Sequence, residues 1–277
     1  MISSSRQLKD KVRNISDGNS NKASTLIRNF MMERFLERVS ISSYRDNFIL
    51  KGGMLVASIV GVDMRATMDI DTTVKANEAD VQRIIEEICN IPLEDNVSFQ
   101  IKSTRTIMEE FDYPGIRVML EATLDRMRQP IKIDISTDDV ITPKAIEYDY
   151  KLMFEDRTIS VLTYNKETLL AEKMQTIINR GIANTRLRDF YDVYSIMNFY
   201  EEQIEKRVLY DAFSATCEKR KTIFTKDDIE ATLHLISDDL HMEELWEQFK
   251  KSNFYVGELE WKSVIDYVEK IMKKNLL

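Results

Sequence analysis

Eight residues, Thr67-Met68-Asp69-Ile70-Asp71-Thr72-Thr73-Val74, have the pattern of a β-strand that carries two aspartates. Alternate side chains of a strand share a face, so Asp69 and Asp71 point the same way while Ile70 points into the core. Two carboxylates this close repel each other unless a cation lies between them. Because Mg²⁺ prefers carboxylate and phosphate oxygens, the pair predicts a site for two Mg²⁺ ions. The alternative is a strand with a solvated acidic face.

A glycine pair precedes this strand. The run Phe48-Ile49-Leu50 is typical of a short strand, Lys51-Gly52-Gly53 follows it, and Met54 to Val60 has the composition of a buried helix. Paired glycines let backbone N–H groups approach phosphate oxygens, and a helix N-terminus favours anionic charge. The pair therefore predicts a phosphate-binding turn, with a simple tight corner as the alternative.

A third acid lies on a later strand. The run Ile131-Lys132-Ile133-Asp134-Ile135-Ser136 alternates strictly, so its isoleucines face one side and Lys132, Asp134 and Ser136 face the other. If this strand pairs beside Asp69-Ile70-Asp71, Asp134 joins the other two carboxylates at one metal site. An ordinary amphipathic strand is the alternative.

The C-terminal half carries a fourth block of charged residues. Glu172-Lys173 and Arg180 are followed by Arg186-Leu187-Arg188-Asp189-Phe190-Tyr191-Asp192. Asp189 and Asp192 lie three residues apart and share a helical face. Lys173 and the arginines supply cations for a triphosphate or an RNA backbone, or else form surface ion pairs.

Composition limits the class of protein. The 277-residue chain has a net charge of −8, which argues against a protein that coats nucleic acid non-specifically but permits a local basic patch. No run approaches the roughly 18–20 apolar residues of a membrane span, and the polar N-terminus is not a signal peptide. The two cysteines and two histidines form no metal-binding pattern. We expect a reduced, cytoplasmic protein whose chemistry uses carboxylates, lysines and arginines.

The order of the patterns predicts an α+β domain followed by a helical one. We expect a loosely held N-terminal arm over residues 1–22, a mixed-sheet domain over 23–165 and a helical domain over 166–277. Strands are expected at 48–50, 67–74, 97–107, 116–124, 131–136 and 158–162, and helices at 23–39, 54–60 and 78–89. Pro114-Gly115 marks a turn before the strand at 116, and Gln129-Pro130 marks a break before the strand at 131. Helices follow at 166–180, 188–205, 207–219, 226–236, 241–252 and 258–275, with Asn165 and Thr225 as N-caps and Gly181 as a C-cap.

Together these motifs resemble those of AbiEii-type toxins, a branch of the DNA-polymerase-β-like nucleotidyltransferases. The resemblance covers roughly residues 45–200 and rests on the glycine pair, the run Arg65 to Asp71, the strand Ile131 to Ser136 and the block Lys173 to Asp192. In the wider superfamily a Gly-Ser dipeptide precedes the Asp-x-Asp motif, whereas this chain has Gly52-Gly53. The difference removes a hydroxyl that could touch the triphosphate.

The resemblance implies a metal-dependent enzyme that transfers a nucleotide from an NTP to an RNA acceptor such as tRNA, as the toxin of an abortive-infection system. It implies that Asp69, Asp71 and Asp134 bind two Mg²⁺ ions, with Asp134 also acting as base, and that Lys173 and Asp192 join them as catalytic residues. It assigns nucleotide binding to Lys51, Gly52, Gly53, Arg65, Arg186 and Asp189, and we expect Lys173 to reach the same cleft from the helical domain. The implied partner is a separately encoded antitoxin that does not bind tightly, and no membrane is involved.

Three alternatives remain open. A small-molecule acceptor, such as an antibiotic, is the main enzymatic one, and a degenerate transferase that only binds nucleotide is the non-enzymatic one. The run Asp69-Ile70-Asp71-Thr72-Thr73-Val74 also fits haloacid-dehalogenase-like phosphatases, in which the first aspartate is a nucleophile. Those enzymes place it after an apolar strand, and Val62 to Met68 is a poor buried strand.

Overall fold

The computed structural model of the protein describes residues 1–61, 64–108 and 114–277. Residues 62–63 and 109–113 lie outside the described part. The chain forms two compact units. We call residues 1–58, 66–139 and 146–163 the sheet unit, and residues 59–65, 140–145 and 164–277 the helical unit. The sequence patterns predict a single boundary near residue 165. The structure adds the short segments 59–65 and 140–145, which precede that boundary in the sequence but belong to the helical unit.

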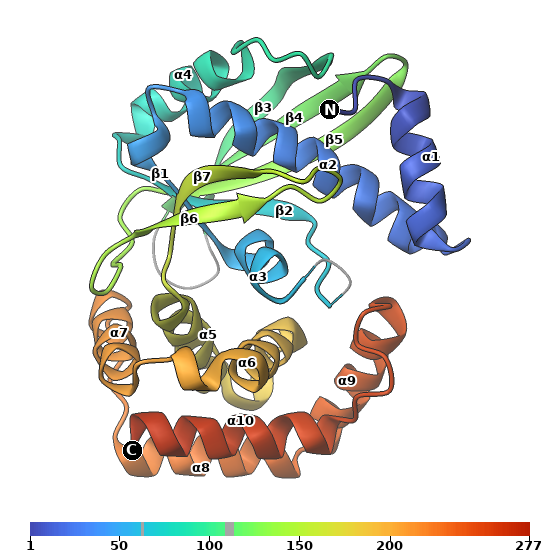
Figure 1. The fold of residues 1–277 in the computed structure, drawn as a ribbon. Coiled ribbons are helices and arrows are strands. Elements are labelled where there is room, and N and C mark those ends of the chain that lie inside the picture. The colour runs from blue at the N-terminus through green and yellow to red at the C-terminus, as the bar shows by residue number, and fades with distance from the viewer. Residues whose placement is uncertain (62–63, 109–113) are drawn as a thin grey trace. The chain divides into compact units, whose positions relative to one another are not determined.

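The sheet unit is built on one seven-stranded mixed sheet of order β3-β4-β5-β2-β1-β7-β6 (Figure 1). The β2–β5 and β1–β7 pairs are parallel and the other four pairs are antiparallel. The strands are β1 (Phe48–Lys51), β2 (Asp69–Val74), β3 (Val97–Met108), β4 (Pro114–Leu124), β5 (Met127–Ser136), β6 (Ile146–Lys151) and β7 (Thr158–Thr163). The α+β fold class predicted from the sequence is therefore confirmed.

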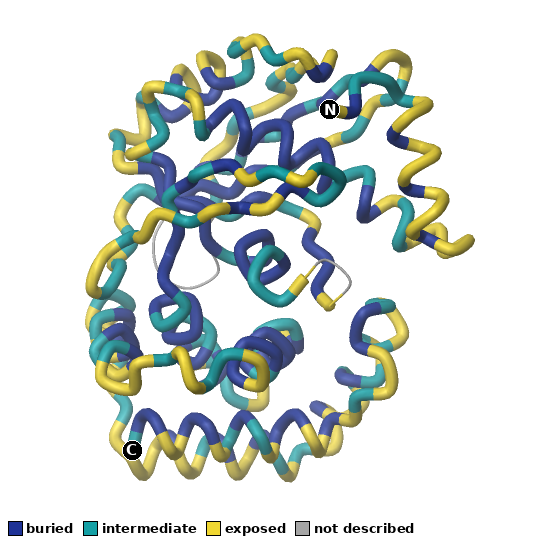
Figure 2. Tube along the Cα trace, in the orientation of Figure 1, coloured by how far each residue is buried: buried dark blue, intermediate teal, exposed yellow. Residues whose placement is uncertain are grey.

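Helices cover both faces of this sheet. Helices α2 (Ser20–Ile41) and α4 (Glu78–Cys89) lie on one face, and α3 (Gly52–Val60) begins on the other (Figure 1). The isoleucines of β5 that alternate with its polar side chains, 131, 133 and 135, are at most 1% exposed. Figure 2 shows α2 and the strands beneath it as largely buried. The other face carries the polar side chains of β2 and β5.

The N-terminal residues are not the loosely held arm that we expected. Residues Ser5–Ser16 form helix α1, whose N-cap is the Ser4 side chain. Leu8 and Val12, one helical turn apart, are 0% and 3% exposed, and α1 packs against α2. Leu8 and Val12 form an apolar stripe of only one helical turn, surrounded by polar residues. So short a stripe does not predict a packed helix, and the sequence therefore suggests an arm.

Two strand expectations also need correction. The predicted break at Gln129-Pro130 is wrong, because β5 runs through it and the hairpin turn falls at Asp125-Arg126, where Asp125 has a φ of 52°. Pro130 is tolerated because β5 pairs with β2 only from Lys132 onward. Strand β6 was not expected from the sequence. Pro114 and Gly115 are the first residues of β4. The turn expected just before them falls on residues outside the described part of the chain.

The helical unit agrees closely with the predicted helices. It consists of α5 (Lys166–Arg180), α6 (Leu187–Tyr200), α7 (Lys206–Lys219), α8 (Lys226–Asp238), α9 (Leu240–Ser252) and α10 (Trp261–Leu276). Asn165 and Thr225 cap α5 and α8 with their side chains, and Gly181 ends α5 with a φ of 50°. No helix in the described residues is both long and apolar enough to cross a membrane.

Candidate active site

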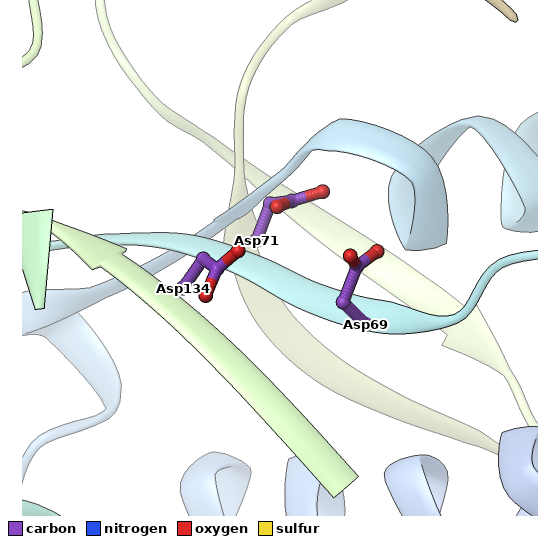
Figure 3. A group of neighbouring side chains, drawn as sticks. All are labelled: Asp69, Asp71 and Asp134. Atoms are coloured by element: carbon purple, nitrogen blue, oxygen red, sulfur yellow. The ribbon is translucent and has the colours of Figure 1, made fainter. Parts of the chain in front are cut away.

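Strand register brings the three predicted aspartates together. Parallel pairing of β2 with β5 sets Asp71 opposite Asp134 and Asp69 opposite Lys132. Residues in register on neighbouring strands point to the same face, and Asp69 lies two residues before Asp71 on that face. One oxygen atom from each of Asp69, Asp71 and Asp134 lies within 4.8 Å of the others. Figure 3 shows the three carboxylates on the same side of the two strands.

The glycine pair supports Asp71. The backbone N–H of Gly53, at the start of α3, donates to Asp71 Oδ2 at 3.2 Å. Gly52 has a φ of +61°, and a Cβ atom there would lie 2.1 Å from Asp71 Oδ2. Glycine is required at position 52 both by the left-handed backbone and by the carboxylate beside it. We expected the pair to contact nucleotide phosphates; in this structure the Gly53 amide serves the protein's own carboxylate.

The ionised form of Asp71 is destabilised by its surroundings. Burial raises its pKa to about 7, Asp69 and Asp134 add to the rise, and Lys51 and the Gly53 amide oppose it. Near neutral pH the carboxyl group is therefore only partly ionised unless a further cation approaches. Such a carboxyl group is a common feature of functional sites.

Two cations that the sequence analysis did not assign to the site contact these acids. Lys132 Nζ lies 2.6 Å from Asp69 Oδ2 and 3.4 Å from Asp134 Oδ2. Arg117, on β4, is in register with Asp134 and donates Nε–H to Oδ1 at 2.7 Å and Nη2 to Oδ2 at 2.8 Å. The alternation of Ile131 to Ser136 predicts that Lys132 faces the same side as Asp134. The position of Arg117 beside Asp134 follows only from the β4–β5 register.

Lys51, the last residue of β1, is in register with Asp71 on β2. Its Nζ donates to Ser136 Oγ at 2.9 Å and to Asp139 Oδ2 at 2.5 Å, and its side chain is buried. Burial alone would raise the pKa of Asp139, but Lys51 and hydrogen bonds from Ser136 and Thr73 outweigh it and hold that pKa well below its ordinary value. Asp139 has no motif around it and was missed. Lys51 therefore influences Asp71 by its charge.

The predicted residues of the helical unit form a second charged cluster. Lys173, on α5, pairs with Asp189 at 3.0 Å and with Asp192 at 2.7 Å, both on α6. Arg65 Nε lies 2.7 Å from Asp192 Oδ1 and Nη2 lies 3.2 Å from Oδ2. The Asp192 side chain is 0% exposed. The family resemblance implies that Arg65 binds the nucleotide, whereas in this structure Arg65 pairs with Asp192.

Charge balance explains how this cluster tolerates burial. Burial raises the pKa of Asp192, yet Arg65 and Lys173 outweigh it and lower that pKa to about 2. Burial lowers the pKa of Lys173, and Asp192 and Asp189 reverse the effect. Asp192 and Lys173 therefore both stay charged at neutral pH. Arg186 stands at the N-cap of α6, and its backbone N–H donates to Asn184 Oδ1 at 2.8 Å.

The carboxylate cluster fits a hard divalent cation. Its donors are oxygens alone, they converge within 4.8 Å, and burial leaves one of them, Asp71, short of positive charge. Mg²⁺ prefers this kind of donor set. Whether the three aspartates hold two ions, and whether Lys173 reaches the same site, stay predictions.

A mixed sheet that presents clustered carboxylates beside a helix begun by two glycines has the features of a nucleotidyl-transfer enzyme. The family model described as "Nucleotidyl transferase AbiEii toxin, Type IV TA system" matches residues 34–270, where TA stands for toxin–antitoxin. The chain belongs to this family of nucleotidyltransferase toxins, which confirms both the resemblance and the predicted enzyme class. Membership implies a nucleotide substrate and a separate antitoxin, and it excludes the phosphatase alternative.

Solved structures show more distant likenesses. JHP933 from Helicobacter pylori is 16% identical, with a TM-score of 0.48 over 90% of this chain and 94% of that one. An antigenic nucleotidyltransferase-like protein from Paracoccidioides brasiliensis is 13% identical, with a TM-score of 0.38 over 84% of this chain and 94% of that one. Neither likeness is close enough to bear on the site. No curated protein matches the chain.

Proposed function

We propose that this toxin transfers a nucleotide from an NTP to an RNA acceptor, with tRNA as a candidate, in a reaction that depends on divalent metal. The observation that carries the proposal is the convergence of Asp69, Asp71 and Asp134 within 4.8 Å. These residues would hold two Mg²⁺ ions. When bound, such ions neutralise charge on a triphosphate and favour in-line attack at the α-phosphate.

The protein's own groups prepare the site for that chemistry. Gly53 fixes Asp71 through its amide, and Arg117 fixes Asp134 through two hydrogen bonds. Both Asp134 oxygens accept from Arg117, which fixes the carboxylate and leaves each oxygen a further lone pair for a metal ion. We therefore assign Asp134 first to metal binding and place its role as base second.

The helical unit would contribute positive charge. Lys173 and Arg65 balance the buried Asp192, and Lys173 also pairs with Asp189 near the surface. We propose that Lys173 neutralises part of the triphosphate charge and that Asp192 holds the lysine in position. Arg186, Lys51 and the two glycines keep their proposed nucleotide-binding roles, Lys51 by charge rather than contact.

The family implies a separate antitoxin. We propose that it counteracts this toxin without tight direct binding, and that the enzyme works in the cytoplasm, where NTPs and RNA are present. Size-exclusion chromatography of the mixed proteins tests the first point, since a stable complex would contradict it.

Labelled transfer tests the proposed reaction. Purified protein is incubated with total RNA, Mg²⁺ and each of the four α-³²P-labelled NTPs in turn, with and without EDTA. We expect label in RNA for one or two NTPs, loss of that label with EDTA, and at least 100-fold less label for Asp69→Asn or Asp71→Asn, given the usual effect of removing a main catalytic group.

A matched control separates the site from a general effect of charge. Asp149 is an exposed aspartate on β6 of the same sheet, and Asp149→Asn should retain wild-type transfer. If the label appears only in small molecules, the acceptor is a small molecule and not RNA. Pyrophosphate release without any labelled product, or full activity of Asp71→Asn, would contradict the proposal itself.

A further inference from the structure

Beyond the carboxylates, the same sheet face is unusually basic for an acidic protein. Strands β3, β4 and β5 project five cations toward the side on which Asp134 lies, and we call these five the basic sheet face: Lys102, Arg105, Arg117, Arg128 and Lys132. In the described part of these strands the same face carries only two carboxylates, Glu121 and Asp134. The whole chain has a net charge of −8, so this face departs in sign from the rest of the molecule.

A pair of arginines at its centre is placed unfavourably for folding. Arg105 on β3 is in register with Arg117 on β4, which in turn is in register with Asp134. Like charges directly opposite each other on neighbouring strands destabilise a sheet. Arg117 is compensated by its two hydrogen bonds to Asp134, but Arg105 has no ion pair with any described residue. An anion from outside the chain would remove the cost.

The cations extend outward from the carboxylates in two directions. Lys132 and Arg117 contact the acids themselves, while Arg105 and Arg128 are exposed and make no ion pair within the described residues. Three strand positions, each about 4.8 Å wide, separate Arg105 from Asp71. Arg128 lies on β5, four residues before Lys132, on the same face. A ligand that touches all of them must be extended and carry repeated negative charges.

The rest of the face favours phosphates over bases. Phe99 is the only aromatic residue in the described parts of β3, β4 and β5, and it lies on the opposite face, 5.8 Å from the ring of Phe35. Proteins that bind single strands through their bases stack them on aromatic side chains. Since the described strand residues offer no such platform, their arginines would contact the sugar–phosphate backbone and not read the sequence.

We propose that the basic sheet face binds the backbone of the acceptor RNA and leads its 3′ end to the carboxylates. The inference rests on the proposed function, and it adds where the acceptor lies and how it is recognised. Arg105 and Arg128 are positioning residues in this scheme, since they are remote from the reacting atoms. Recognition is by charge, so binding is independent of sequence and strongly dependent on salt.

Binding in EDTA tests the face without any need for turnover. A fluorescein-labelled single-stranded RNA ending in a 3′-deoxynucleotide is titrated with the full chain, and anisotropy is followed from about 0.05 to 0.2 M KCl, the range over which phosphate contacts are most visible. We expect Arg105→Gln and Arg128→Gln each to raise Kd roughly fivefold at the lower salt, the scale of one exposed ion pair. Each should reduce the slope of log K against log salt by about 0.7, for RNAs of unrelated sequence alike.

The control variant is Arg83→Gln. Arg83 is an exposed arginine of α4, which covers the opposite face of the sheet, and it should bind RNA as the wild type does. In the transfer reaction we expect Arg105→Gln/Arg128→Gln to raise KM for RNA and to leave KM for NTP unchanged.

Each outcome has a separate meaning. An unchanged Kd for the double variant, or an equal loss for Arg83→Gln, overturns the inference even if the wild type labels RNA. A raised KM for NTP alone shows that the face serves the nucleotide and likewise overturns it. If the wild type labels no RNA, the proposed acceptor is wrong, and the anisotropy result still decides whether the face binds RNA.

Discussion

Asp71 meets residues from two other elements of the carboxylate site, strand β5 and helix α3. It faces Asp134 in register, accepts a hydrogen bond from Gly53, and occupies the space that a side chain at position 52 would need. Its pKa of about 7, against an ordinary value of 3.8, records how poorly its charge is compensated by the protein alone. Variants of Asp71 and of Gly52 can therefore test the site.

The first prediction concerns stability in metal-free buffer. Because the folded-state pKa of Asp71 is raised, the folded protein binds a proton between about pH 4 and 7 that the unfolded chain has lost, so the free energy of unfolding falls as pH rises through that window. Asp71→Asn removes this penalty. We expect the variant to be more stable than wild type by roughly 1–3 kcal/mol at pH 8, and equal at pH 4, in urea titrations with EDTA. A variant less stable at pH 8 would show that the charge is well compensated.

The second prediction uses two glycines with nearly equal backbone angles. Gly52 and Gly257 have φ values of +61° and +60°, but a Cβ atom meets Asp71 at Gly52 and nothing within 4 Å at Gly257. Alanine should cost about 1 kcal/mol at Gly257 because of the left-handed backbone, and more at Gly52, where the Cβ atom must also displace Asp71. Only Gly52→Ala should also lose nucleotide transfer, by at least tenfold, since it displaces Asp71. Similar transfer rates for the two variants would mean that the position of Asp71 is not critical.

Among the secondary-structure elements, β5 and α5 do most to position charged groups. Strand β5 pairs with β2 on one side and β4 on the other, so it sets both the Asp71–Asp134 pair and the Arg117 contact. Helix α5 carries Lys173 and is capped at its start by Asn165, whose Oδ1 accepts from the Thr168 amide at 2.7 Å. The same side chain donates Nδ2–H to the Thr142 carbonyl at 2.6 Å.

The third prediction separates these two hydrogen bonds of Asn165. Asn165→Asp keeps the helix cap and loses the donor to Thr142, whereas Asn165→Ala loses both. We expect Asn165→Ala to lower the free energy of unfolding by roughly 1–3 kcal/mol and Asn165→Asp to lose less, since the cap itself is worth about 1 kcal/mol. Urea denaturation measures both. An aspartate variant as unstable as the alanine variant would assign the effect to Thr142 instead of the cap.

At the scale of the whole molecule, the proposed chemistry uses a charged cluster from each of the two compact units. The sheet unit holds three carboxylates with Lys132 and Arg117, and the helical unit holds Lys173 and Arg65 around Asp192. We expect transfer to require both clusters, because a triphosphate needs cations in addition to the metal-binding acids.

The fourth prediction tests this requirement. Lys173→Ala should reduce NTP affinity or turnover at least tenfold with saturating Mg²⁺, and Lys173→Arg should retain more activity because it keeps the positive charge. Lys173 also pairs with the buried Asp192, so its loss could destabilise the fold. The melting temperature of each Lys173 variant is therefore measured too, and Lys262→Ala, at an exposed lysine, is the control. Equal NTP affinity and equal turnover in Lys173→Ala would restrict Lys173 to a structural role.

Much of this protein was predictable because its signals are local. The period-2 alternation of Ile131 to Ser136 identified a strand and its polar face, Asn165 and Thr225 marked the starts of α5 and α8, and the motifs indicated the family. Alternation and capping depend only on residues a few positions apart, so they can be read before any tertiary contact is known.

Other features were decided only by the tertiary structure. Arg117 and Asp139 have no local pattern; the β4–β5 register places Arg117 beside Asp134, and Asp139 contacts Lys51, which is distant from it in the sequence. The burial of α1 and the use of the Gly53 amide by Asp71 depend on partners distant in sequence. The sequence alone therefore determined the family and predicted the three aspartates as a candidate site, while long-range strand pairing decided which charges surround them, because pairing depends on packing across the whole sheet and not on neighbours along the chain.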